Sequence, residues 1–303
     1  MNFSIVIAVN KKDLWFCRIC VASIRHYYPE VPIYLLKDEL NGIFSTKEME
    51  EYWNVQLIEY PIKHFGWSAA KVHFYCDERF KGQRFLVLDA DIVFSGRLLD
   101  RPFVQGFAED VIVSEEVFSD PTKDWFIKTY FDYEAVKKFD SEYSFQGFTF
   151  NCGQLFCKGG FLDRKQMEPF FDFTRLPAWK QPTVFPLVDQ SVFNYLLPTL
   201  ARKGDLQIGR QLYMLWSETD TVRNLDLSKV RSGEAYPYLV HWAGALRIPY
   251  LRKMTASSVL VFFENYYYHA VPFGFWKKIV RKCKPVTVYY VRRLIQSVKT
   301  KIK

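Results

Sequence analysis

The chain has 303 residues, of which 49% are hydrophobic and 18% aromatic, and its formal net charge is +8. A chain of this length and apolar content can bury a large core, which excludes an intrinsically disordered protein. The charge is concentrated in residues 271–303, which hold ten of the 41 Lys and Arg residues and no Asp or Glu, so that 31 basic residues face 33 acidic ones elsewhere. Because this body is nearly neutral, we expect no nucleic-acid partner.

The first part of the chain alternates predicted strands and helices, joined by short turns. The order is strand 3–9, helix 14–28, strand 31–36, strand 55–60, helix 68–80 and strand 85–94. A strand–helix–strand order with short turns is typical of a right-handed crossover in a nucleotide-binding α/β sheet. In such sheets ligands bind at the carboxyl ends of the strands.

The second part of the chain adds further alternating elements. They are strand 111–113, strand 148–157, helix 161–173, helix 188–197, strand 211–216 and strand 238–244. Gly153 interrupts strand 148–157. A glycine inside a strand pattern indicates a bulge or a close approach of another group to the backbone. The chain as a whole therefore predicts an α/β fold.

Two carboxylates interrupt the apolar run 85–94, at Asp89 and Asp91. An unpaired buried carboxylate costs several kcal/mol, so we expect something to neutralise this pair. Side chains two positions apart share one face of an extended strand, and paired oxygen ligands suit Mg²⁺ or Mn²⁺. The alternative is a strand end followed by a turn, where Asp is common.

Cysteine usage and the N-terminal sequence predict the cellular compartment. Six cysteines are scattered along the chain, and Cys17-x-x-Cys20 has no second pair at metal-binding spacing. Met1 leads directly into the first strand, no signal peptide is readable, and no apolar run is long enough to span a membrane. We therefore expect a protein of the reducing cytoplasm.

Six features follow one another in the order of a known family. They are Asn10 after the first strand, Lys71, Asp89-Ala-Asp91, Phe150-Asn-Cys-Gly153, Asp189-Gln190 and His241-Trp-Ala-Gly244. Across roughly residues 3–250 this set resembles the GT-A glycosyltransferases, in particular the retaining family 8 group of glycogenin and bacterial lipooligosaccharide galactosyltransferases. The resemblance implies a Rossmann-like mixed sheet flanked by helices. It also implies transfer of a hexose from a UDP-sugar to a glycan or glycolipid acceptor, with retention of configuration.

The resemblance implies a metal site of three ligands, Asp89, Asp91 and His241. A lone histidine is more often a core or surface residue, and the glycine three positions later is what matches His241 to the family. Because imidazole suits softer cations than oxygen ligands do, His241 favours Mn²⁺ over Mg²⁺ as the cofactor.

The resemblance also implies a donor-binding set. It comprises Ala8, Asn10, Trp15, Lys71, Asp89, Ala90, Asn151, Gly153, Asp189, Gly244 and Arg247. Trp15 either stacks on uracil or belongs to the core, and Lys71 either steadies the donor or is a solvated helix residue. Arg247 takes the place of a lysine in the family's pattern.

Two residues are implied in catalysis, Asp189 and Gln190. Asp189 would bind hydroxyls of the donor sugar, and Gln190 would lie on the reacting face. A glutamine is no strong base, which fits attack from the leaving-group side with a diphosphate oxygen taking the acceptor proton. Ser191 follows this pair, where the family often has Asp or Gly.

Residues 1–270 are expected to form the catalytic domain and residues 271–303 a basic amphipathic helical tail. Such a tail, with Phe275 and Trp276 among its cations, is typical of a helix on an anionic membrane surface. It would place the protein peripherally on the inner face of the membrane. The alternatives are a helix that packs on the domain and an arm that binds nucleic acid.

Two other functions are compatible with parts of the pattern. A nucleotidyltransferase acting on sugar phosphates also uses paired carboxylates, but it normally has a glycine-rich loop after the first strand, and residues 8–13 contain no glycine. A non-catalytic glycan-binding or membrane scaffold protein would not need the Asp89, Asp91 and His241 ligands.

Overall fold

The computed structural model describes residues 3–66, 68–116, 120–176, 178–244 and 250–283. Its centre is a seven-stranded sheet in the order β3-β2-β1-β4-β7-β6-β8. The strands are β1 (Phe3–Asn10), β2 (Ile33–Asp38), β3 (Val55–Leu57), β4 (Arg84–Asp89), β6 (Val111–Glu116), β7 (Thr149–Lys158) and β8 (Ile208–Gln211). Strand β7 runs antiparallel to β4 and β6, and the other pairs are parallel. The predicted mixed α/β sheet is therefore confirmed.

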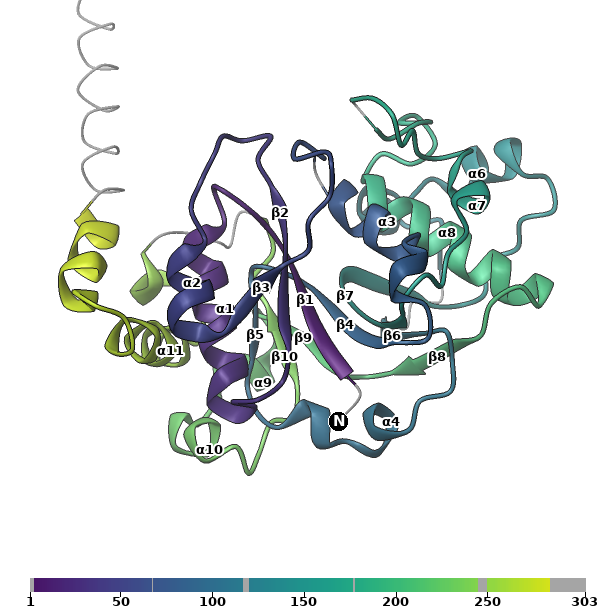
Figure 1. The fold of residues 1–303 in the computed structure, drawn as a ribbon. Coiled ribbons are helices and arrows are strands. Elements are labelled where there is room, and N and C mark those ends of the chain that lie inside the picture. Colours follow the sequence, from purple (N-terminus) through teal and green to yellow (C-terminus); the bar gives the residue numbers. More distant parts are fainter. Residues whose placement is uncertain (1–2, 67, 117–119, 177, 245–249, 284–303) are drawn as a thin grey trace, which may run out of the picture.

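Helices cover both faces of this sheet (Figure 1). One face carries α1 (Leu14–Tyr27), α2 (Lys47–Trp53) and α11 (Ser257–His269), and the other carries α3 (Ala69–Tyr75) and α8 (Val188–Lys203). Along β1, Ile5 and Ile7 enter one hydrophobic core and Val6 enters the other. Burial on both faces explains why the central strands are continuously apolar rather than alternating.

A second, three-stranded sheet lies beside the first. It is formed by β5 (Ile92–Phe94), β10 (Leu239–His241) and β9 (Met214–Trp216), with β10 in the middle. The single strand predicted over residues 85–94 is therefore wrong. The chain turns at Ala90 and Asp91, after which β5 leaves the main sheet and pairs antiparallel with β10.

The other elements described between residues 78 and 253 are short. They are α4 (Pro102–Gln105), α5 (Asp124–Thr129), α6 (Tyr133–Phe139), α7 (Arg164–Met167), α9 (Asp220–Arg223), α10 (Leu227–Ser232) and the 3₁₀ turns Glu78–Phe80, Leu98–Asp100 and Leu251–Lys253.

Three further sequence predictions are corrected at the level of element boundaries. The helix expected over 161–173 is only α7, and that expected over 68–80 ends at Tyr75. The strand expected over 211–216 is divided between β8 and β9, which belong to different sheets.

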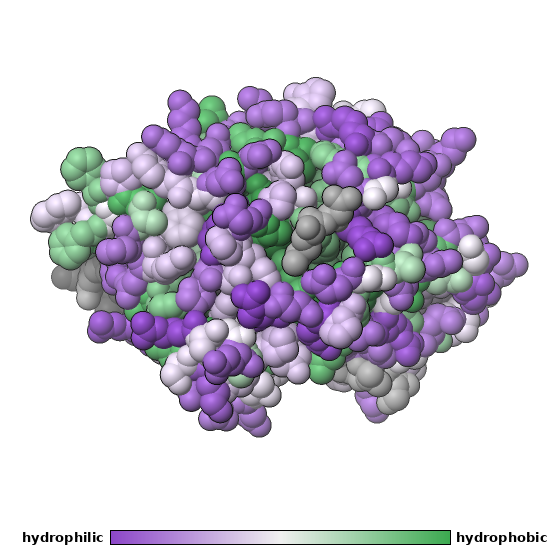
Figure 2. Space-filling model, turned by 60° about the horizontal axis from the view of Figure 1, so that its bottom comes forward, coloured by the Kyte–Doolittle hydropathy of each residue, from purple (hydrophilic) through white to green (hydrophobic). Residues whose placement is uncertain are grey.

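The start of the C-terminal tail packs on the domain. Residues 274–283 are helical, and Lys277 Nζ lies 2.6 Å from Glu48 Oε2 on α2, while Arg281 pairs with Glu264 on α11. The side chains of Phe273, Phe275 and Trp276 remain exposed, at 79%, 69% and 64%. The start of the tail is the yellow helix at the left of Figure 1, and Figure 2, turned about the horizontal axis, shows pale green hydrophobic groups on that side of the molecule. Among the residues described, no helix is long and apolar enough to cross a bilayer.

Candidate active site

Three potential metal ligands converge at the carboxyl end of β4. Asp89 ends that strand, Asp91 lies in the turn that follows, and His241 ends β10. One ligand atom from each lies within 4.8 Å of the others. His241 Nε2 is 3.3 Å from Asp91 Oδ1, and both side chains are almost fully buried.

The small sheet brings His241 to the carboxylates. His241 pairs with Ile92 of β5 across the antiparallel ladder, and the next residue, Trp242, donates its N–H to Asp91 O at 3.2 Å. A one-residue slip of this register would turn the imidazole to the opposite face of the small sheet. Residues 150 positions apart in the chain are thus placed together by strand pairing.

Both alternatives predicted for Gly153, a bulge and a close approach of another group to the backbone, occur there. The β6–β7 register jumps, so that Val113 is opposite Leu155 while Glu115 is opposite Phe150. A Cβ atom at Gly153 would lie 2.7 Å from His241 Cε1, a contact that real Cβ atoms do not make. The glycine therefore makes room for the imidazole.

Asn151 determines which nitrogen of His241 carries hydrogen. Gly153 N donates to Asn151 Oδ1 at 2.9 Å, which identifies that atom as the amide oxygen, and His241 Nδ1 lies 3.0 Å from the same oxygen. An amide oxygen only accepts, so Nδ1 carries hydrogen and Nε2 is the nitrogen that faces Asp91 and is left for a metal. This is the tautomer that a histidine needs to bind a metal through Nε2.

Lys71 joins the metal cluster to helix α8. Its Nζ lies 2.9 Å from Asp89 Oδ1, 3.0 Å from Asp189 Oδ2 and 2.9 Å from Cys152 O. The side chain is 1% exposed, so the solvated-lysine alternative is wrong. Burial acts to lower the pKa of Lys71, but Asp189 and Asp89 outweigh it and raise that pKa, which keeps the ammonium charged.

Asp189 and Gln190 lie in the first turn of α8. The Gln190 amide is bonded to the bulged strand on both sides: Oε1 accepts from Cys152 N at 2.9 Å, and Nε2 donates to Phe150 O at 2.8 Å. These bonds give hydrogen-bond partners to Cys152 N and Phe150 O, which lie where the bulge interrupts the β6–β7 ladder.

The remaining predicted donor residues line the same edge of the sheet. Ala8 is opposite Asp89 in the β1–β4 ladder, and Asn10 closes the next turn by donating to Asp13 Oδ2 at 2.6 Å. Trp15 is partly buried against the core, and the guanidinium carbon of Arg281 lies 5.5 Å from its ring centroid.

Two predicted donor residues follow β10. Gly244 has φ +59°, a conformation that favours glycine. Arg247 lies outside the described residues.

The cluster fits a divalent cation. Lys71 pairs with Asp89 and Asp189, while Asp91 lies against His241, so a metal ion would offset negative charge that Lys71 alone does not neutralise. Two carboxylates and one imidazole form a mixed oxygen and nitrogen ligand set, which manganese accepts.

The sequence does not predict two residues that lie beside the ligand cluster, Glu116 and Trp216. The Trp216 ring stacks on the His241 ring with centroids 5.2 Å apart, and its indole N–H donates to Glu116. Glu116 ends a short strand and Trp216 ends another, so no local pattern in the sequence relates either to His241.

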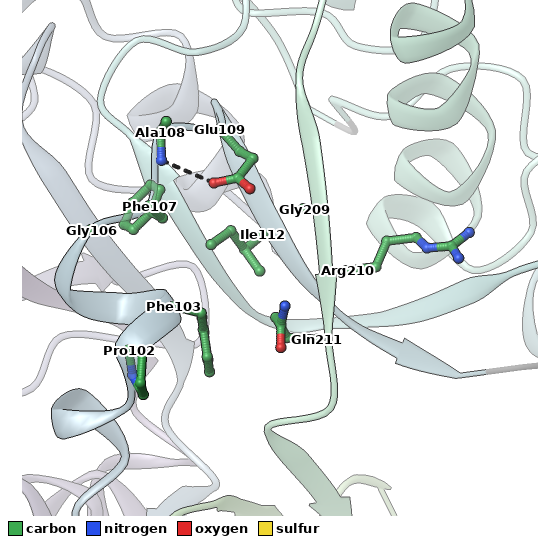
Figure 3. A pocket seen from close by; sticks show the side chains of 10 residues that line it. All are labelled: Pro102, Phe103, Gly106, Phe107, Ala108, Glu109, Ile112, Gly209, Arg210 and Gln211. Atoms are coloured by element: carbon green, nitrogen blue, oxygen red, sulfur yellow. Dashed lines mark hydrogen bonds between the residues drawn. The ribbon is translucent and has the colours of Figure 1, made fainter.

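A cavity of about 250 Å³ lies elsewhere, between α4 and the start of strand β6 (Figure 3). Its walls include Phe103, Phe107, Ile112 and the Glu109 side chain, which accepts from Ala108 N. These residues lie at the end of the sheet opposite Asp89, because β6 and β4 run in the same direction. The cavity is therefore separate from the ligand cluster.

Comparison with solved structures identifies the fold. The apo structure of WbbM, a bifunctional glycosyltransferase, matches with a TM-score of 0.56 and 16% identity over 92% of this chain, which spans 51% of that one. The galactosyltransferase LgtC, solved with donor and acceptor sugar analogs, matches with a TM-score of 0.52 and 14% identity, over 89% of this chain and 97% of that one. No protein-family model and no curated protein sequence matches.

The structure therefore has a GT-A glycosyltransferase fold. The ordered motifs of the sequence predict this same fold.

Proposed function

We propose that the protein is a divalent-metal-dependent glycosyltransferase that moves a hexose from a UDP-sugar to a glycan or glycolipid acceptor. One observation carries the proposal: the Asp89, Asp91 and His241 cluster lies beside the Lys71–Asp189 ion pair at the carboxyl edge of a GT-A sheet. This edge is where α/β sheets bind nucleotides. The neighbouring galactosyltransferase, solved with sugar analogs, supports the same class of chemistry.

The metal would be Mn²⁺, with Mg²⁺ as the alternative, held by Asp89, Asp91 and His241 Nε2. When bound, it supplies positive charge to the diphosphate that leaves during transfer. Lys71 is already fixed beside Asp89 and adds a second positive charge without any reorganisation.

The donor would lie along the ends of β1, β4 and β7. Asn10 and Trp15 would contact the nucleoside, with Ala8 and Ala90 beside it. Asn151, Gly153 and Asp189 would contact the sugar. Gly244 and Arg247 are assigned to the diphosphate by the family pattern alone.

Transfer would proceed with retention of configuration. The acceptor oxygen forms its bond to the anomeric carbon on the face from which UDP departs, the bond between that carbon and the phosphate oxygen breaks, and the acceptor proton passes to a diphosphate oxygen. No protein base is needed. Gln190, whose amide is held by the backbone of β7, would shape the reacting face rather than take a proton.

The acceptor would be reached at an anionic membrane surface, with the protein peripheral on its inner face. The exposed Phe273, Phe275 and Trp276 supply apolar groups for insertion, and the cations of residues 284–303 supply charge. Residues 284–303 themselves lie outside the described part of the chain.

The proposal is tested by donor turnover in Asp91→Asn, which removes a charged ligand without changing the side-chain shape. With Mn²⁺ and a panel of UDP-hexoses, we expect UDP release by the wild type and none above background by Asp91→Asn. Equal UDP release by both proteins would contradict the proposed site. No UDP release by the wild type with any UDP-hexose and acceptor would contradict the proposed activity.

A further inference from the structure

The imidazole ring of His241 is contacted both on its flat face, by Trp216, and at its Nδ1 edge, by Asn151. Trp216 and His241 are opposite each other in the parallel β9–β10 pair, and their rings stack with an interplanar angle of 15°. Asn151 fixes the Nδ1 edge of the imidazole, as described above. The tryptophan therefore limits tilting of the ring that Asn151 alone would leave possible.

Trp216 is itself held by Glu116. The indole N–H donates to Glu116 Oε1, and the other carboxylate oxygen accepts from the hydroxyl of Tyr130. Both oxygens of Glu116 thus have a donor from a different element, one from β9 and one from the segment after α5. A carboxylate fixed in this way has little freedom to rotate and fixes the indole in turn.

The main-chain oxygen of Tyr130 also contacts the first turn of α8. The Ser191 hydroxyl donates to Tyr130 O and accepts from Leu187 N at 3.0 Å. Ser191 directly follows the Asp189-Gln190 pair. A chain of contacts therefore runs from His241 through Trp216, Glu116 and Tyr130 to the helix that carries Asp189.

We propose that Glu116 is a positioning residue for the metal site, acting on His241 through Trp216. The proposal rests on the proposed function, because it takes His241 as a metal ligand. Outer groups that orient a ligating histidine commonly change metal affinity by about 10- to 100-fold when removed. Glu116 is not one of the three residues of the ligand cluster and reaches His241 only through Trp216 in the contacts given above.

The test is the dissociation constant of Mn²⁺ alone, measured on the full chain by the loss of the free-ion paramagnetic resonance signal. Glu116→Ala is expected to weaken Mn²⁺ binding by about tenfold or more. Glu116→Gln keeps an oxygen that accepts the indole N–H and is expected to stay within about threefold of the wild type. The matched control is Glu115→Ala, because Glu115 is the preceding residue and pairs instead with Arg210 at 3.3 Å.

A turnover measurement separates positioning from a general structural role. If Glu116 acts through the metal, excess Mn²⁺ restores the rate of Glu116→Ala, whereas a rate that stays low at saturating Mn²⁺ contradicts the proposal. If Glu116→Ala does not fold, Trp216→Phe tests the same contact, since it keeps an aromatic ring to stack on His241 and removes the indole N–H that Glu116 accepts. A dissociation constant for Trp216→Phe equal to that of the wild type would then overturn the proposal.

The possible results of the Mn²⁺ measurement separate the proposed metal-dependent function from the positioning role of Glu116. A wild type that does not bind Mn²⁺ overturns the proposed function and this inference together. A wild type that binds Mn²⁺ while Glu116→Ala binds it equally well overturns the positioning role alone. Weakening in Glu116→Ala together with rescue in Glu116→Gln supports it.

Discussion

Lys71 Nζ lies 3.0 Å from Asp189 Oδ2, and this contact joins α3 to α8 across the bulged strand β7. The same ammonium group reaches Asp89 at 2.9 Å. One buried cation thus connects a proposed metal ligand with the residue proposed to bind the donor sugar. The site is organised around this lysine before any ligand binds.

Replacing Lys71 should therefore affect stability as well as activity. Lys71→Met leaves two carboxylates without their buried cation, and removing one partner of a buried pair costs about 3–5 kcal/mol. Urea denaturation of the metal-free protein measures this loss. The matched control is Lys81→Met, because Lys81 is 72% exposed and pairs with Glu78 on the surface, where such pairs contribute about 0–1 kcal/mol. Equal unfolding free energies for the two variants would show that Lys71 is not the central cation.

Gly153 should be irreplaceable for metal binding even though its backbone permits alanine. In Gly153→Ala the new methyl group would lie 2.7 Å from both His241 Cε1 and Asn151 Oδ1, so the imidazole must move. We expect Mn²⁺ affinity to fall at least about tenfold. Gly106→Ala is the control, since no atom lies within 4 Å of its added Cβ. Unchanged Mn²⁺ binding in Gly153→Ala would mean that His241 is not held where the structure places it.

The sequence predicts the main sheet well because its strands are buried on both faces. The runs at β1 and β4 are mainly apolar, and the carboxylates at the end of β4 and in the turn after it stand out against them. Gly153 also stands out, because a glycine inside a strand pattern indicates a bulge or a close approach to the backbone.

Other parts depend on contacts that no local pattern records. The prediction of one strand through Asp91 failed because β5 finds its partner in β10, far along the chain. The burial of Lys71 depends on Asp189, and the role of Trp216 depends on the β9–β10 register. Residues of this kind become visible only when the tertiary structure is known.

The exposed aromatic groups at the start of the tail allow the membrane proposal to be tested without unfolding. The triple substitution Phe273→Ser, Phe275→Ser and Trp276→Ser leaves the Lys277–Glu48 and Arg281–Glu264 pairs in place. It should release most of the protein from anionic liposomes in sedimentation, because the hydrophobic part of the binding is lost.

The control for the tail is Leu212→Ser, a substitution of an apolar residue that is 54% exposed on another part of the surface. It should leave liposome binding unchanged. If the triple variant sediments as the wild type does, the aromatic groups are not a membrane contact.

The most direct test of a metal-dependent nucleotide-sugar site is the melting temperature of the protein with UDP, measured in Mn²⁺ and in excess EDTA. Because Asp89, Asp91 and Asp189 outnumber the cations around them, UDP should bind only when a divalent metal bridges the carboxylates to its diphosphate. We predict a rise in melting temperature with UDP and Mn²⁺ together, none with UDP in EDTA, and none with UDP and Mn²⁺ in Asp91→Asn. Equal stabilisation of the wild type by UDP in EDTA and in Mn²⁺ would contradict the account.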